Sequence, residues 1–354
     1  MRIAMISTPF VPVPPRHYGG TELVVHELVE GLLDRGHEVT LFATGDSHSR
    51  APLFSLYPSA QWPPGWFTDL NHTTWAMSQA AEGSYDVIHA HSAAALALQR
   101  FVPDTPLVYT LHHAHEPEMS AYYAQFPEVA FAAISNDQCR REGGVPRCAV
   151  IHHGLDPSRF QCTRRAASYV CFVGRFAREK GIHTAIDAAE LAGVPIRVAG
   201  EVHPRDRNFG HAEVEPRLAL PHVTYLGCIG SDQKVPLLRD ARALLAPIDW
   251  NEPFGLVLIE AMLSGCPVVA FRRGSVPELI EHGVTGLIVD SLEEMVRCIR
   301  PGGPVDQLDR QAIRTDAVAR FNHRRMAAEY ERLYDEVVAA DATTPAGQWP
   351  ISAA

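Results

Sequence analysis

Short apolar runs alternate with longer amphipathic stretches along nearly the whole chain. Runs of this kind cover 2–7, 38–43, 86–91, 107–111, 130–135 and 149–152 in the first half, and 169–173, 196–199, 223–226, 244–248, 268–271 and 286–289 in the second. Such runs are typical of strands buried on both faces of a parallel sheet. Stretches such as 22–33 predict the intervening helices. The alternation therefore predicts an α/β protein with doubly wound parallel sheets.

The repeat of this pattern in each half predicts two domains, which agrees with a length of 354 residues. We place the first domain at 1–155 and the second at 168–320, joined by a polar linker at 154–167. The Pro-rich stretch 58–64 predicts a surface loop. A helical pattern covers 308–338, and 341–354 is predicted to be a disordered tail.

The composition of the chain limits the classes of molecule that it could bind. A net charge of −10 without a Lys/Arg cluster argues against nucleic acid and against tight binding to anionic lipid. No apolar run has the length of a membrane span, and the N-terminus begins with a strand rather than a signal peptide. Seven cysteines without a C-x-x-C pair indicate reduced thiols in a cytoplasmic protein. The sequence leaves the oligomeric state open.

The segment 252–269, EPFGLVLIEAMLSGCPVV, carries the most chemistry. Gly255 lets the backbone approach a ligand, and the N–H groups of Phe254, Gly255 and Leu256 would face an anion such as a diphosphate from a helix N-terminus. Glu252 and Glu260 would each accept hydrogen bonds from hydroxyls, one from a sugar and one from a ribose. An ordinary helix start with acidic residues is the alternative for this segment alone.

A second segment, YVCFVGRFAREKG at 169–181, is an apolar strand that ends at Gly174 and is followed by Arg175 and Lys180. The carboxyl ends of strands are where open α/β sheets bind ligands. A guanidinium fork and an ammonium together suit a diphosphate. Taken alone, this segment is equally compatible with a solvated loop.

Both segments in this order resemble family 4 of the retaining glycosyltransferases, which share the B-type fold of two Rossmann-like domains. The resemblance covers nearly the whole chain, including RIAMIS at 2–7, the Gly19-Gly20 loop, TLHH at 110–113, AISN at 133–136, VTYLG at 223–227 and GSVPELIEHGVTGLIV at 274–289. It implies that the last helix, at about 320–340, returns to the first domain and completes it.

The resemblance also implies roles for residues at these motifs. Arg175 and Lys180, next to Gly174, would bind the donor diphosphate. Glu252 would hold a hydroxyl of the donor sugar and Glu260 the ribose. The remaining donor contacts would come from the Gly19-Gly20 loop, from the amides of Phe254, Gly255 and Leu256, and from the backbone of Cys228 and Ile229 at the base. The catalytic set would be His112, beside the reacting sugar, with Arg175, Lys180 and Glu252.

The function so implied is retaining transfer of a hexosyl group from a nucleotide diphosphate sugar, with UDP favoured, to a hydroxyl of a small-molecule or glycan acceptor. No D-x-D motif is present, so no metal is expected. His112, His113 and His115 lack a further ligand at zinc spacing and are interpreted as a polar wall. Two alternatives stay open: a non-catalytic regulatory protein that binds sugar nucleotides, and an enzyme of the same fold with phosphate or water as acceptor.

Acceptor binding is expected at loops of the first domain, 16–21, 55–72 and 112–123, whose aromatic side chains could stack on a sugar or cap a core edge. Two features depart from the family pattern. His153 stands where an Asn is usual, which puts the role of that side chain in doubt. The insertion at 201–220 precedes VTYLG and has no assigned role.

Overall fold

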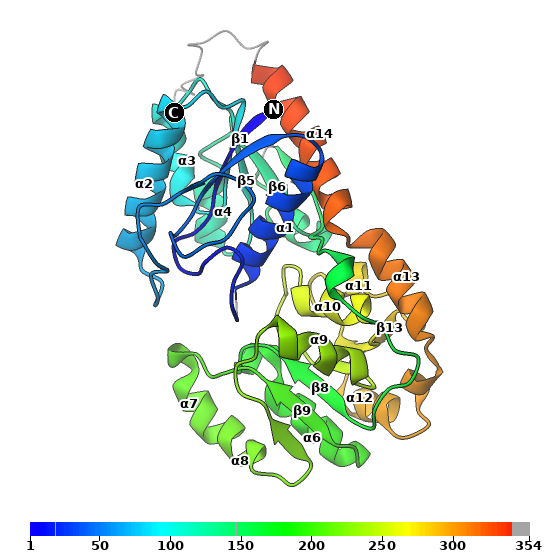
Figure 1. The fold of residues 1–354 in the computed structure, drawn as a ribbon. Helices are drawn as coiled ribbons and strands as arrows, with labels where there is room; N and C mark the ends of the chain where they lie inside the picture. Colours follow the sequence, from blue (N-terminus) through cyan, green and yellow to red (C-terminus); the bar gives the residue numbers. More distant parts are fainter. Residues whose placement is uncertain (18, 146, 342–354) are drawn as a thin grey trace.

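The computed structural model describes residues 1–17, 19–145 and 147–341. It has two α/β domains, each built on one parallel sheet, as predicted (Figure 1). The first sheet has seven strands in the order β3-β2-β1-β4-β5-β6-β7. These are β1 (Arg2–Ile6), β2 (Glu38–Phe42), β3 (Leu53–Phe54), β4 (Val87–Ala90), β5 (Leu107–Thr110), β6 (Ala130–Ala133) and β7 (Cys148–Val150).

The second sheet has six strands in the order β10-β9-β8-β11-β12-β13. These are β8 (Val170–Val173), β9 (Ile196–Ala199), β10 (Val223–Tyr225), β11 (Leu244–Ala246), β12 (Val268–Phe271) and β13 (Gly286–Val289). The order reverses beside β1 in the first sheet and beside β8 in the second. In such sheets, ligands bind at the carboxyl ends of the strands near this reversal.

Helices cover both faces of each sheet. The first domain contains α1 (Gly20–Asp34), α2 (Trp66–Glu82), α3 (Ala94–Leu98), α4 (Pro117–Tyr123) and α5 (Asn136–Arg141). The second contains α6 (Ile182–Ala192), α7 (Arg207–Phe209), α8 (Glu215–Leu218), α9 (Ser231–Asp240), α10 (Leu256–Leu263), α11 (Val276–Leu279), α12 (Leu292–Ile299) and α13 (Arg310–Arg320). The insertion at 201–220 thus forms short helical segments.

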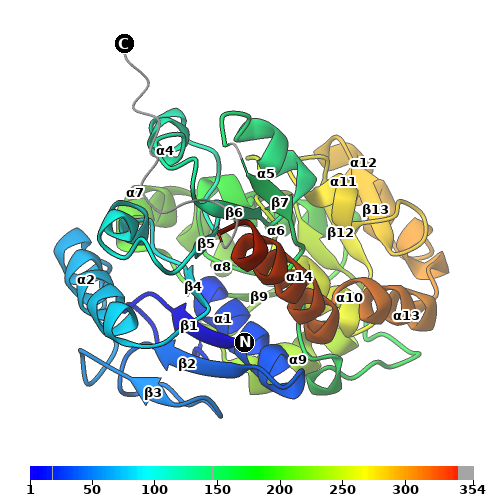
Figure 2. The same cartoon turned by 90° about the horizontal axis from the view of Figure 1, so that it is seen from above.

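The last helix, α14 (His323–Asp341), returns to the first domain. Helices α13 and α14 run along one side of the molecule from the second domain to the first (Figure 1), and Figure 2 shows the same pair from above. Met326, Tyr330 and Tyr334 are fully buried in one core with Leu28 of α1. A Cβ atom added at Gly31 of α1 would lie 2.8 Å from Cβ of Ala327, so the two helices pack too closely for a side chain at Gly31.

The structure corrects several local predictions. The pattern at 308–338 is two helices, because the chain at Phe321 and His323 leaves the helical hydrogen bonds to pair with Leu155. The region 55–72 is not all loop, since α2 begins at Trp66. The region 112–123 likewise ends in α4, where Tyr123 is buried. The domain limits at 155 and 168 stay predictions, and the predicted tail lies outside the described residues beyond Asp341.

We expect Gly31→Val to destabilise the first domain by about 1–3 kcal/mol, because the new side chain must displace α14 from α1. Chemical denaturation measures the effect. Gly144→Ala is the control, since no atom of the described residues, apart from its own chain neighbours, lies within 4 Å of the added Cβ there. Unchanged stability in Gly31→Val would contradict the close packing of these helices.

Candidate functional site

The N-terminus of α10 lies after the carboxyl end of β11, at the predicted position. Gly255 has φ +88°, which a residue with a side chain rarely adopts, and it ends the loop so that α10 begins at Leu256. In the part of the chain that the structure describes, the amides of Phe254, Gly255 and Leu256 have no hydrogen-bond acceptor. These three N–H groups are therefore free to bind an anion.

Glu252 and Lys180 come together beside these amides. The two side chains form an ion pair, and Oε2 of Glu252 also accepts a hydrogen bond of 2.7 Å from Nε1 of Trp250. Nζ of Lys180 lies 4.8 Å from the centre of the Trp250 ring. Trp250 was not predicted, although its place two residues before Glu252 is a signal that sequence reasoning could have used.

Arg175 lies at the carboxyl end of β8, as predicted, and is held by two carboxylates. Its guanidinium forms ion pairs with Glu179 and with Asp206 of the insertion. Because a guanidinium has five N–H donors, two carboxylates do not exhaust its hydrogen-bonding capacity. The contact gives the insertion a structural role that the sequence did not indicate.

Glu260 lies in α10 and is almost fully buried. Its Oε1 accepts a hydrogen bond of 2.6 Å from Nζ of Lys234 in α9, a partner that sequence reasoning missed. Both side chains line a cavity of about 460 Å³ that also includes Leu23 and Glu27 of α1. Cys228, which is exposed, and Ile229, which is buried, lie on the loop between β10 and α9.

His112 lies two residues after the end of β5 and is half-buried; it forms a column with three buried histidines, His89, His91 and His153. Its Nε2 lies 2.7 Å from Nδ1 of His91, and its ring stacks on that of His153 with centres 5.7 Å apart. His153 in turn packs edge-on against Phe254 of the second domain, with ring centres 4.9 Å apart. The unusual His153 thus connects His112 to the anion-binding amides.

Burial lowers the pKa values of these imidazoles, because it disfavours their charged form. The pKa of His153 falls to about 3, and so does that of His89, whose ring lies 4.4 Å from that of His91. Burial and neighbouring imidazoles hold the pKa values of His91 and His112 well below the usual range. The column is therefore neutral at physiological pH.

The N-terminus of α1 meets that of α10. A Cβ atom added at Gly20 would lie 3.5 Å from Cδ1 of Leu256, and one at Gly19 would lie 2.8 Å from Cβ of Pro15. The predicted Gly19-Gly20 loop therefore reaches the anion-binding end of the second domain. Two helix N-termini point positive partial charge at one region.

Family models match both domains. The model for Glycosyltransferase Family 4 covers residues 18–159, and the model for Glycosyl transferases group 1 covers residues 163–300. The chain belongs to glycosyltransferase family 4. The glycogen synthase of Mycobacterium tuberculosis is 26% identical, in an alignment that covers 94% of this chain and 94% of that protein. The phosphatidyl-myo-inositol mannosyltransferase of the same species is 25% identical over 97% of this chain and 98% of that protein.

Solved structures confirm the B-type fold. The sucrose-phosphate synthase from Thermosynechococcus elongatus matches 96% of this glycosyltransferase and 99% of its own chain, with a TM-score of 0.80 at 21% identity. The Anabaena protein HepE in complex with UDP-glucose matches 95% of this chain and 100% of its own, with a TM-score of 0.73 at 22% identity. At these identities the likeness establishes the fold, while the residue roles stay predictions.

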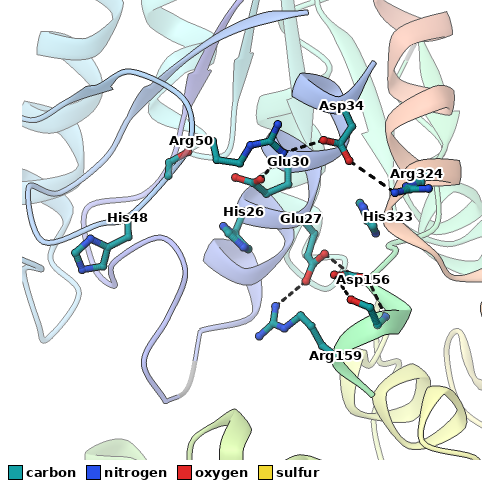
Figure 3. Close-up of a pocket in the computed structure, with 12 residues that line it drawn as sticks. His26, Glu27, Glu30, Asp34, His48, Arg50, Asp156, Arg159, His323 and Arg324 are labelled. Carbon is teal, nitrogen blue, oxygen red and sulfur yellow. Dashed lines mark hydrogen bonds and ion pairs between the residues drawn. The ribbon is translucent and has the colours of Figure 1, made fainter. Parts of the chain in front are cut away.

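A larger cavity, of about 640 Å³, lies beside the linker and contains none of the predicted site residues. Figure 3 shows Glu27 of α1 pointing toward the linker, where it accepts hydrogen bonds of 2.8 Å from Arg159 and from the amide of Asp156. Arg50 bridges Glu30 and Asp34 on the same helix. Burial raises the pKa of Glu27 to about 7, against the opposing effect of Arg159. The hydrogen bonds of Glu27 attach the linker to the glycosyltransferase's first domain.

Within the described ranges, no three His, Cys, Asp or Glu side chains are grouped so that they could hold a metal ion. None of the helices in those ranges is long and apolar enough to cross a membrane. Metal-independent activity stays a prediction.

Glu278 joins the domains at a separate point. Its carboxylate accepts hydrogen bonds from the amides of Asn136 and Asp137 at the start of α5, at 2.7 and 2.6 Å, and lies 3.2 Å from Nε2 of His152. Burial alone would raise the pKa of Glu278, but the hydrogen bonds outweigh it and lower the pKa to about 2. The ionised carboxylate therefore stabilises the contact.

We expect Glu278→Gln to lower the melting temperature at neutral pH, because the amide replaces an acceptor that faces backbone N–H groups. A depressed pKa means that the wild-type stabilisation is complete above about pH 4.5 and is lost as the pH falls toward about 2. The difference between the two proteins should therefore narrow below pH 4.5.

Thermal melts at several pH values measure this difference. Glu281→Gln, the same substitution at an exposed neighbouring position, is the control and should show no such dependence. A wild-type advantage that stays constant down to pH 3 would contradict the assignment.

Proposed function

We propose that the protein is a retaining hexosyltransferase that moves a sugar from a nucleotide diphosphate donor, with UDP favoured, to an acceptor hydroxyl without a metal ion. Membership of glycosyltransferase family 4 supports the reaction class. The relatives named above are a glycogen synthase and a mannosyltransferase, and the Anabaena neighbour holds UDP-glucose. These names favour a hexosyl group and a uridine nucleotide.

One observation carries the proposal: anion-binding and hydroxyl-binding groups meet where the two domains touch. The unpaired amides at the start of α10 lie beside Lys180 and Glu252 in the second domain. Gly20 and the histidine column approach the same point from the first domain through Leu256 and Phe254. A diphosphate on the amides would therefore hold its sugar between Glu252 and His112.

In the proposed reaction, the bond between the anomeric carbon and the diphosphate oxygen breaks, and the leaving oxygen takes the electron pair. The acceptor oxygen forms a bond to the anomeric carbon from the same face, and its proton passes to the leaving phosphate. Arg175, Lys180 and the amides of Phe254, Gly255 and Leu256 stabilise the charge that develops on that phosphate. These groups replace the metal ion that other nucleotide-sugar enzymes use.

The ion pair between Lys180 and Glu252 fits this reaction. A bound diphosphate offers the ammonium a stronger anionic partner, which frees the carboxylate to accept a hydrogen bond from a sugar hydroxyl. Trp250 keeps its hydrogen bond to Glu252 and so holds the carboxylate in place during the exchange. Phosphate binding and sugar binding are thereby coupled through one salt bridge.

A panel of nucleotide sugars tests the proposal. We expect slow release of free nucleotide from the true donor, faster release with an acceptor, and a product of unchanged anomeric configuration by NMR. Activity should survive a strong chelator. Loss of activity in chelator that magnesium or manganese restores would overturn the metal-independent mechanism, and donor binding without any turnover would favour a regulatory protein.

Substitutions of the two glutamates should have different effects on the binding of the nucleotide sugar and of the bare nucleotide. Glu260→Ala should weaken both the nucleotide sugar and the bare nucleotide diphosphate, because the ribose is common to both. Glu252→Ala should not weaken binding of the bare nucleotide, since the substitution only releases Lys180 from its ion pair, and should weaken binding of the nucleotide sugar. Loss of a charged hydrogen bond costs about 1.5–3 kcal/mol, or about ten- to a hundredfold in affinity, which calorimetry resolves.

Isosteric Glu252→Gln and Glu260→Gln are the matched variants, since they keep the side-chain size while removing the charge. Equal weakening of bare nucleotide by Glu252→Ala and Glu260→Ala would show that the donor lies along α10 in a different direction.

A further inference from the structure

Three side chains, from β1 and from the residues that follow β4 and β5, form a hydrogen-bonded row that ends at His112. Met5 on β1 lies opposite His89 in the sheet register, and His91 follows β4. Nε2 of His91 lies 3.2 Å from Sδ of Met5, and Nδ1 of His91 lies 2.7 Å from Nε2 of His112. The row leads from the core of the first domain to the proposed sugar site.

The chemistry of the thioether fixes the direction of these hydrogen bonds. A thioether sulfur has no hydrogen and can only accept, so Nε2 of His91 must carry the hydrogen. A neutral imidazole has one N–H, which leaves Nδ1 of His91 as an acceptor. Nε2 of His112 must then donate, and Nδ1 of His112 is left without a hydrogen.

The surroundings keep this arrangement neutral and ordered. Burial holds the pKa values of His91 and His112 well below the usual range, so neither ring gains a second N–H at physiological pH. The ring of His153 stacks on that of His112 and restricts its rotation. Nδ1 of His112 has no hydrogen-bond partner among the described residues, and this nitrogen is not fully buried. It stays open to a ligand.

We propose that His91 is a positioning residue that fixes His112 as the Nε2–H tautomer, so that Nδ1 of His112 accepts a hydrogen bond from a hydroxyl of the donor sugar. The second half of this proposal rests on the proposed function, whereas the tautomer does not. Fixing the tautomer before the sugar arrives means that no proton has to be rearranged on binding, which keeps the site preorganised.

Nitrogen NMR of histidine-labelled protein without ligand tests the tautomer directly. We expect a protonated Nε2 and an unprotonated Nδ1 for His112 across pH 6–8. Met5→Leu removes the sulfur while nearly keeping the volume, so the signals of His91 and His112 should shift toward a mixture of tautomers. Met77→Leu, at a buried methionine of α2 outside the row, is the matched control and should leave these signals unchanged.

Kinetics test the consequence for the reaction. His91→Phe should lower kcat on the order of tenfold or more. Affinity for bare nucleotide diphosphate should change little, because the substitution disturbs only the His112 ring beside the donor sugar. His91→Gln should restore most of the activity, since its amide can donate to Met5 and its carbonyl can accept from His112.

Each outcome decides a separate point. A protonated Nδ1 or a charged ring at His112 would overturn the tautomer assignment whatever the enzyme does. The Nε2–H tautomer together with full activity in His91→Phe would overturn the positioning role. The Nε2–H tautomer in a protein that transfers no sugar from any donor would contradict the proposed function alone.

Discussion

The placement of the two domains depends on the two chain crossings between them, which are hydrogen-bonded to each other. The amide of Leu155 donates to the carbonyl of Phe321 at 2.9 Å, and the amide of His323 donates to the carbonyl of Leu155 at 3.1 Å. Gly154 lies so close to Asn322 that no side chain fits there. Since His153 immediately precedes this point, the paired crossings set the position from which it contacts Phe254. The geometry at the proposed site therefore depends on these paired crossings.

Charge is distributed along the site in a way that suits an elongated, anionic ligand. Cations and helix N-termini gather where the diphosphate would lie, and Lys180 is paired with Glu252 in the described structure. At the other end, Lys234 neutralises the buried Glu260. Because an unpaired buried carboxylate is costly, each glutamate needs such a partner before a ligand arrives. The salt bridges thus keep the empty site stable and still leave carboxylate oxygens for hydroxyl groups.

The sequence predicts the sheets well because parallel strands buried on both faces leave an uninterrupted apolar run. All twelve predicted strands begin within about one residue of the run that indicated them, and β9 at Ile196–Ala199 matches its run fully. The two-residue β3 leaves no such pattern and was missed. The break between α13 and α14 was also missed, since it depends on Leu155, a partner far away in the sequence. Resemblance supplied the candidate site residues, whose roles stay predictions, and their partners Trp250, Lys234 and Asp206 could be found only from the fold.

The proposed sugar end of the site is built differently from the proposed phosphate end, and electrostatics explains why. A cation there would draw the diphosphate away from the amides of α10, and an additional carboxylate would repel it. Imidazoles whose pKa values are lowered by burial avoid both problems, because they carry no charge and still offer one donor and one acceptor. The neutral column of His89, His91, His112 and His153 can therefore stand close to an anionic donor without competing for its phosphates. Burying His89 and His91 costs little because both ring nitrogens of each side chain have a hydrogen-bonding neighbour.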